Sequence, residues 1–119
     1  MKSGRKASGG KYVKPKKKKL TGRHGQVRIT KLAALKTKLL RGRGGNEKLT
    51  SFSNNVTSVM VKGKAKQSKI KNVLETPSNS FLARQNILLK GAIIETELGK
   101  AEITNRPSQE GNIQAVLLD

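Results

Sequence analysis

The feature that most constrains this chain is the basic run at residues 14–25, "KPKKKKLTGRHG", inside a stretch with hardly any apolar residues. Repulsion among four consecutive lysines and their basic neighbours opposes compact packing of the segment alone. So few apolar side chains also bury too little surface to offset the conformational entropy lost on ordering. Residues 1–28 are therefore predicted to be disordered until they meet an anionic partner.

Positive charge is concentrated in the first half of the chain. The 119 residues include 26 Lys and Arg against 7 acidic residues, for a formal net charge of +19. Residues 1–50 hold 17 basic residues and one acid, whereas residues 51–119 hold nine basic residues and six acids. This asymmetry indicates a nucleic-acid or other anionic partner for the first half. The second half is expected to be a nearly neutral folded module.

The composition argues against several classes of function. The absence of cysteine excludes a disulfide framework, a zinc ribbon and a cysteine nucleophile. The single histidine, His24, lies in the basic segment without a partner to orient it as a general base. No apolar run approaches the roughly 18–20 residues of a membrane span, and the N-terminus does not resemble a secretory signal. We expect a soluble intracellular protein with no catalytic residues, metal ion, cofactor or small-molecule substrate.

Glycines interrupt the basic segment at positions 4, 9, 10, 22 and 25. Because glycine lets the backbone approach a ligand closely, this spacing favours an arm that orders against phosphates over a solvated tail. Charge alone selects the candidate RNA-binding residues Lys14, Lys16, Lys17, Lys18, Lys19 and Arg23.

The segment "ITKLAALKTKLLR" (29–41) is ambiguous. Leu32, Leu35 and Leu39 share one helical face and Thr30 is a possible N-cap, which predicts a basic amphipathic helix for a membrane surface or a protein partner. Alternatively, these leucines join the core of the following module. We favour the second interpretation.

From Lys48 onward the pattern predicts short strands. "KLTSF", "NVTSVMV" (55–61) and "IKNVLE" (70–75) alternate or are rich in β-branched residues. The basic stretch 61–69 is predicted to be a hairpin loop, and residues 79–87 a short helix capped by Asn79. Residues 92–104 predict a hairpin with its turn near Leu98 and Gly99, and residues 112–118 a last strand.

Four to six short strands over about 80 residues predict an all-β fold, a small antiparallel barrel or sandwich. The core is thin, and a domain of this size is expected to be marginally stable without its partner. The predicted core includes Val59, Val61, Ile70, Leu74, Ile87, Ile93, Ile103 and Val116.

The glycine-rich stretch "GRGGNEK" (42–48) is neither a Walker loop nor a dinucleotide fingerprint, because its glycine and lysine spacings match neither pattern. What remains is a glycine turn flanked by the cations Arg41, Arg43 and Lys48. The backbone amides of the turn are able to contact a phosphate at close range. An ordinary turn between strands fits the spacing equally well.

Aromatic residues are scarce, with only Tyr12, Phe52 and Phe81 in the chain. Because both phenylalanines are expected in the core, we do not predict binding by stacking bases on aromatic rings. Binding is instead expected through phosphate, sugar and shape, to a folded RNA rather than to a uniform duplex. Charge does not separate RNA from DNA, so a chromatin-type DNA-binding protein is the alternative.

Residues 74–118 closely resemble the archaeal-type members of the small-subunit ribosomal protein eight family, shared by archaea and eukaryotes. "RGRGGNEK" (41–48) is similar to the family's Arg-Gly-Gly-Asn segment, and "GRKASGGK" (4–11) to its N-terminal Arg-Lys-x-Thr-Gly-Gly element. This chain departs from the family at Ser108, where glycine is usual, at Ser8, where threonine is usual, and in lacking aromatic residues before the Arg-Lys element.

The resemblance implies a small antiparallel β-barrel at residues 37–119 and a long basic extended arm at residues 1–36. It implies a strand at 36–41 and leaves 29–35 undecided. The implied role is that of a structural constituent of the cytoplasmic small ribosomal subunit, not an enzyme. The implied partners are small-subunit ribosomal RNA and neighbouring small-subunit proteins, with no membrane. The implied RNA-binding residues are Arg5, Lys6, Gly9, Gly10 and Lys11 in the arm, Arg41, Arg43, Gly44, Gly45, Asn46 and Lys48 in the glycine turn, and Arg106 in the last turn.

Overall fold

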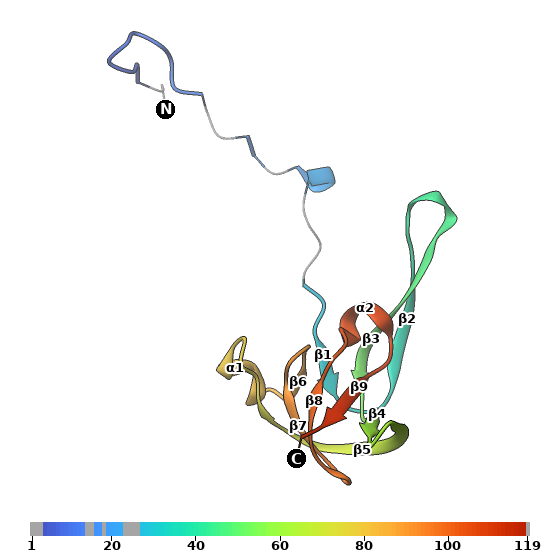
Figure 1. Cartoon of the computed structure of the whole chain (residues 1–119). Coiled ribbons are helices and arrows are strands. Elements are labelled where there is room, and N and C mark those ends of the chain that lie inside the picture. Colours follow the sequence, from blue (N-terminus) through green and yellow to red (C-terminus); the bar gives the residue numbers. More distant parts are fainter. Residues whose placement is uncertain (1–3, 14–15, 18, 23–26, 119) are drawn as a thin grey trace.

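The computed structural model describes residues 4–13, 16–17, 19–22 and 27–118. Its folded part is built from two sheets and a few short helical turns (Figure 1). Five strands form a closed barrel in the order β4-β5-β7-β8-β9. The predicted all-β barrel is therefore confirmed. The barrel strands are β4 (Val56–Val61), β5 (Lys64–Glu75), β7 (Ile93–Thr96), β8 (Gly99–Ile103) and β9 (Gln114–Leu117).

One of the five barrel pairings is parallel rather than antiparallel. β4 pairs with β9 in parallel, with Met60 opposite Val116, while the other four pairings are antiparallel. The cause is geometric, because five strands of alternating direction place the first and the last in the same direction. The barrel therefore closes through a parallel pair.

A second sheet has the order β2-β3-β1-β6 and lies beside the barrel. It contains β1 (Thr30–Leu32), β2 (Lys36–Arg41), β3 (Glu47–Asn54) and β6 (Ile87–Leu88). The strand predicted at 36–41 is confirmed. The boundary after residue 36 remains a prediction, and β1, which precedes it, pairs with both β3 and β6.

The leucines of residues 29–41 follow the favoured interpretation, that they join the core, only at Leu32. Leu35 and Leu39 are 64% and 53% exposed, so they do not join the core, and no helix forms there. Only Leu32 packs against the core. The reason is that β2 and β3 form a hairpin that projects away from the barrel (Figure 1), so that most side chains of β2 lie beyond the core and are exposed.

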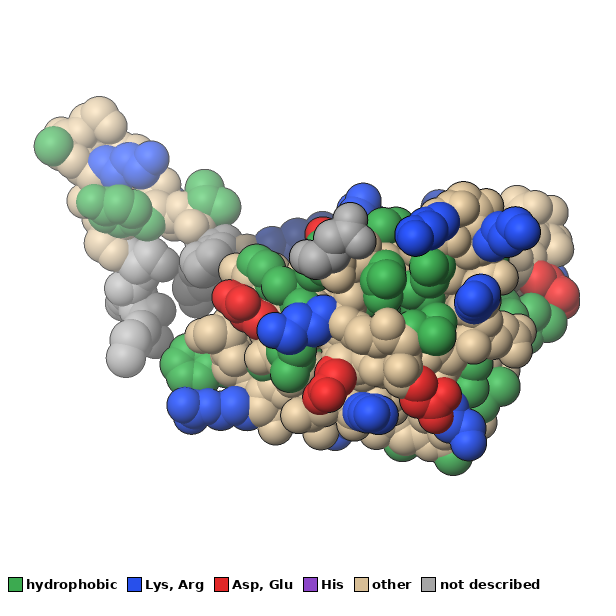
Figure 2. All heavy atoms as spheres, turned by 60° about the horizontal axis from the view of Figure 1, so that its bottom comes forward, with side chains coloured by type: hydrophobic (Ala, Val, Ile, Leu, Met, Phe, Trp, Pro, Cys, Tyr) green, Lys and Arg blue, Asp and Glu red, His purple; other side chains and the backbone are tan. Residues whose placement is uncertain are grey.

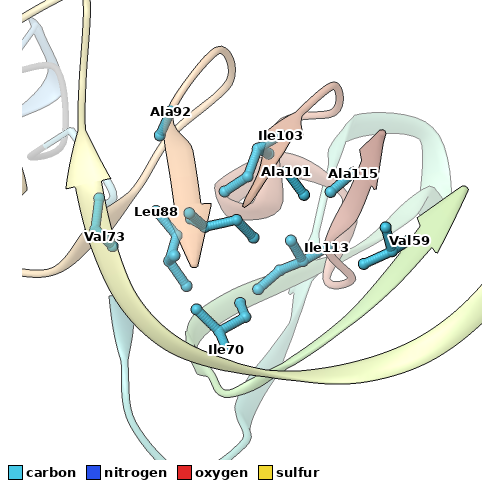
Figure 3. Packing of buried hydrophobic residues seen from close by; sticks show 10 residues of the cluster. Val59, Ile70, Val73, Leu88, Ala92, Ala101, Ile103, Ile113 and Ala115 are labelled. Carbon is cyan, nitrogen blue, oxygen red and sulfur yellow. The ribbon is translucent and has the colours of Figure 1, made fainter. Parts of the chain in front are cut away.

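The core lies inside the barrel (Figure 3). Four predicted core residues, Val59, Ile70, Ile87 and Ile103, are buried, and Val61 and Ile93 are half-buried. Leu74 and Val116 are 42% and 44% exposed, which corrects their assignment to the core. The inward positions of β5 and β9 are instead the preceding residues, because neighbouring side chains of a strand point to opposite faces. The core cluster comprises Val59, Ile70, Val73, Leu88, Ala92, Ile94, Ala101, Ile103, Ile113 and Ala115.

The basic stretch 61–69 is mostly strand, not the predicted loop. β4 and β5 are joined by Lys62 and Gly63 alone, with φ angles of 46° and 79°. Two residues with positive φ are what a tight hairpin turn with the right-handed twist of the strands requires. β5 then runs from Lys64 for 12 residues, with its lysines exposed.

Two short helices complete the folded part. α1 (Ser80–Ala83) begins at the predicted cap, because the Asn79 side chain accepts a hydrogen bond from the Phe81 N–H at 3.1 Å. It ends at Ala83 and not at residue 87 as predicted, because Ile87 is paired in β6. α2 (Pro107–Glu110) contains Ser108 in a regular turn, so that departure from the family demands no left-handed residue. The left-handed position is Gly111, with φ of 77°, where a Cβ atom would lie 2.7 Å from the Leu49 side chain. Glycine therefore allows α2 to pack closely on β3.

Candidate nucleic-acid interface

The glycine turn at residues 42–46, the hairpin tip, joins β2 and β3 and projects away from the barrel (Figure 1). It contains a 3₁₀ turn, η2 (Arg43–Gly45), in which Gly44 and Gly45 have φ angles of 72° and 75°. The Gly42 N–H donates to the Asn46 carbonyl at 2.6 Å, and the Asn46 side-chain amide donates to the Arg43 carbonyl at 3.1 Å. Asn46 thus closes the turn from inside. Arg41, Arg43, Gly44, Gly45 and Asn46 are all exposed.

The three cations Lys48, Lys90 and Arg106 line one shallow hollow beside α2, here called the cationic hollow. They come from β3, from the link between β6 and β7, and from the residue before α2. Lys48 is held by a hydrogen bond from its ammonium group to the Gln109 side-chain oxygen. The fold therefore brings together Lys48 and Arg106, which the sequence analysis assigned to separate contacts, the glycine turn and the last turn. The remaining lining residues are Thr104, Asn105, Gln109 and Glu110.

Asn105 fixes the turn that carries Arg106. Its side chain is buried, and its Nδ2 lies 2.9 Å from a carboxylate oxygen of Glu110 and 3.0 Å from the Asn112 carbonyl. Its Oδ1 accepts from the Gln114 N–H at 3.0 Å. The turn is therefore attached to both α2 and β9, and the Glu110 carboxylate is hydrogen-bonded to Asn105.

Sequence reasoning missed Lys90, which stands alone between Leu89 and Gly91. No charge run or motif marks it. Its place in the cationic hollow follows from the packing of the β6–β7 link beside β3 and α2, which only the tertiary structure shows.

The arm contains a second closed glycine turn at residues 5–11. The Lys6 N–H donates to the Gly10 carbonyl at 2.8 Å, and the Gly9 N–H donates to the Lys6 carbonyl at 2.9 Å. Gly9 has φ of 78°, and the Arg5 guanidinium donates to its carbonyl at 3.2 Å. Both glycine motifs thus form turns edged by exposed cations, and residues 4–13 lie away from the barrel and from the hairpin tip (Figure 1).

Of the RNA-binding candidates in the arm that were predicted from charge alone, the structure describes some and not others. Lys16, Lys17 and Lys19 are exposed. Lys14, Lys18, Arg23 and His24 lie outside the described residues.

The barrel face shown in Figure 2 is not uniformly positive. Lys and Arg side chains are interspersed there with Glu and hydrophobic side chains. Within the described ranges, no group of three or more His, Cys, Asp or Glu side chains could hold a metal ion. None of the helices found in those ranges is long and apolar enough to cross a membrane.

The burial of the phenylalanines differs in part from the prediction that both lie in the core. Phe81 is 69% exposed and Tyr12 is 56% exposed, while Phe52 is half-buried. The assignment of Phe81 to the core is therefore wrong. A single helical turn directs the half-buried Leu82 and Ala83 toward the protein and leaves Phe81 on the solvent side.

Fold and surface together define a small basic β-barrel protein whose exposed cationic turns are suited to a polyanion. The chain belongs to the ribosomal protein S8e family, whose model matches residues 1–118.

Several relatives match over nearly their whole length. The small ribosomal subunit protein eS8 of Methanococcus aeolicus is 40% identical, with 98% of this chain and 94% of that protein covered. The protein of the same name from Methanocorpusculum labreanum is 40% identical over 99% and 96% of the two chains. That of Halorubrum lacusprofundi is 38% identical over 98% and 95%.

Proposed function

We propose that this protein is a structural, non-catalytic constituent of the small ribosomal subunit in the cytoplasm, and that it binds ribosomal RNA. The observation that carries the proposal is the 38–40% identity, over nearly the full length, to proteins named small ribosomal subunit protein eS8. The net charge of +19 supports it, because RNA is the polyanion of that particle. Neighbouring small-subunit proteins are the further partners.

The proposed mechanism is electrostatic. Lys and Arg side chains release the counterions condensed on RNA phosphates, which supplies affinity without reading sequence. The two glycine turns add close backbone approach, and the proposed arm, residues 1–36, extends the contact beyond the proposed barrel domain, residues 37–119, which includes β3, β6 and most of β2 of the second sheet. An extended arm and a projecting hairpin suit folded RNA, whose proteins recognise shape, phosphates and 2′-hydroxyls.

A chromatin-type DNA-binding role is the second candidate, and one observation favours it. β2 and β3 form a projecting two-stranded ribbon with basic residues, an element that fits the major groove of B-DNA. A-form RNA has a major groove too narrow for such reading. The two candidates therefore differ in which nucleic acid the ribbon contacts, and fractionation of the native host's lysate separates them.

The cationic hollow provides a specific test of RNA binding. We expect the triple variant Lys48→Gln, Lys90→Gln, Arg106→Gln to lose about 100-fold in affinity for small-subunit ribosomal RNA at ~0.1 M salt, with a log–log salt slope shallower by about 2. The reason is that three phosphate contacts and their released counterions disappear together. Fluorescence anisotropy with labelled RNA measures both quantities.

The matched control for the hollow removes the same charge elsewhere. Lys64, Lys66 and Lys69 are exposed on β5, so their triple change to Gln alters net charge equally without touching the hollow. This control variant is expected to lose less than about tenfold in affinity for the RNA, because only the long-range electrostatic attraction is reduced. Equal losses in the two triple variants would mean that net charge, and not the hollow, determines affinity.

A further inference from the structure

We propose that Phe81 and Arg84 form a binding site for one unpaired nucleotide, with the base stacked on the Phe81 ring and its phosphate on the Arg84 guanidinium. This inference rests on the proposed function, since it assumes RNA as the partner. It adds a site that lies outside both glycine turns and the cationic hollow.

The first support is the exposure of Phe81. The residue is 69% exposed although it belongs to the folded part of the chain, between β5 and β6. Its neighbours Leu82 and Ala83 are half-buried, and Ala83 packs against the core. An exposed ring on a turn anchored in this way offers a free π-face, which is what stacking on a base of any identity requires.

The second support is that the turn is fastened before and after the ring. The buried Thr76 hydroxyl donates to the Asn79 carbonyl at 2.5 Å, and the Asn79 side chain caps the Phe81 N–H. At the far end, the Asn86 N–H donates to the Ala83 carbonyl at 2.9 Å, and the Asn86 carbonyl accepts from Leu32 N–H of β1 at 2.9 Å. A ring on a fixed turn loses little backbone freedom on binding, so more of the stacking energy appears as affinity.

The third support is the position of Arg84. It follows Phe81 by three residues in helical conformation, with φ of −60° and ψ of −24°, which places the two side chains on one side of the turn. Arg84 is exposed. A planar cation beside an aromatic ring is complementary to a nucleotide, which carries a flat base and an anionic phosphate.

The surroundings on the turn favour a base over a protein partner. Apart from Phe81 itself and Pro77, the exposed residues from position 77 to position 85 are polar or charged: Ser78, Asn79, Ser80, Arg84 and Gln85. An aromatic hot spot in a protein interface is usually encircled by contacts that exclude water. A lone ring among polar groups and a cation matches a splayed nucleotide better.

The site also has a distinct location. α1 lies on the opposite side of the barrel from the β2–β3 hairpin (Figure 1). A nucleotide held on α1 would therefore be a contact separate from the one at the hairpin tip.

The decisive experiment uses tryptophan as a reporter. The chain contains no tryptophan, so the full-length Phe81→Trp variant reports on this position alone. We expect its fluorescence to be quenched severalfold when small-subunit ribosomal RNA binds, because the indole stacks on a base. Binding is followed independently by the anisotropy of labelled RNA. Unquenched fluorescence at saturating RNA would overturn the site, because the indole would then not be stacked on a base.

Affinity measurements supply a second readout. Phe81→Leu is expected to weaken RNA binding by at least fivefold with the salt slope unchanged, because it removes stacking and no charge. The RNA affinity of the Phe81→Tyr variant should stay within about twofold of that of the original chain, since tyrosine keeps the aromatic ring. Equal affinities for the Leu variant and the original chain would refute the proposal. If the original chain itself fails to bind the RNA, the proposed function fails, which is a separate outcome.

Discussion

The affinity of the isolated protein for small-subunit ribosomal RNA is expected to fall by roughly 10³-fold or more when salt rises from ~50 to ~200 mM. Exposed cations of the arm, the hairpin tip and the cationic hollow supply the contacts. If they engage ~8 phosphates of irregular RNA, counterion release gives a log–log slope near −6.

This salt dependence is measured by titrating labelled RNA with protein at five or more salt concentrations and plotting log affinity against log salt. The slope counts phosphate contacts and does not depend on which bases are present. A slope shallower than about −2 would contradict the electrostatic mechanism, because it would leave room for only about three contacts.

Deletion of residues 1–28 is expected to leave the barrel folded and to weaken RNA binding by more than about 100-fold at ~0.1 M salt. These residues carry 11 Lys and Arg. If they make about half of the phosphate contacts, their loss brings the slope from near −6 to near −3. β1 begins at Thr30, so both sheets and the hydrogen bond from the Thr30 hydroxyl to Ser51 at 2.8 Å are retained.

Two measurements on the truncated chain check this prediction. The spread of amide resonances in an NMR spectrum reports whether the barrel is folded, and RNA titration reports the affinity. Collapse of the amide dispersion would show that residues 1–28 are needed for folding, against the proposed division of the chain. Retained affinity would show that the barrel alone carries the binding.

Much of the fold could be predicted from local patterns. Alternating, β-branched residues located β4, the hairpin pattern around Leu98 and Gly99 located β7 and β8, the stretch 112–118 located β9, and the Asn79 cap located α1. The errors arose where local pattern does not determine tertiary contacts. Leu74 and Val116 are as apolar as their buried neighbours, and only the strand register decides which of two adjacent residues faces inward.

Two further errors in the fold have physical causes. Residues 64–69 have the composition of a solvated loop because β5 is exposed there, and exposed strands tolerate lysine as loops do. Leu35 and Leu39 have helical spacing by coincidence, since they precede or lie on an edge strand with open faces.

The candidate interface was predictable where it is contiguous in sequence. The glycine turn at 42–46 carries its cations within a few residues, so composition revealed it. The cationic hollow joins residues 48, 90 and 106, and no local signal links Lys90 to the others. Phe81 was misplaced because aromatic residues are usually buried, and its exposure depends on how one turn packs.

The most direct test of the central claim is sedimentation of the tagged protein from its native host. The lysate is separated on a sucrose gradient after a high-salt wash, and the tag is followed through the fractions. Our account predicts that the protein sediments with small ribosomal subunits and stays bound through the wash. Although salt weakens each phosphate contact, the assembled particle holds the arm and the folded part at several places at once, so one released contact re-forms before the others are lost. Protein that stays at the top of the gradient, or that follows chromosomal DNA, would contradict a ribosomal role.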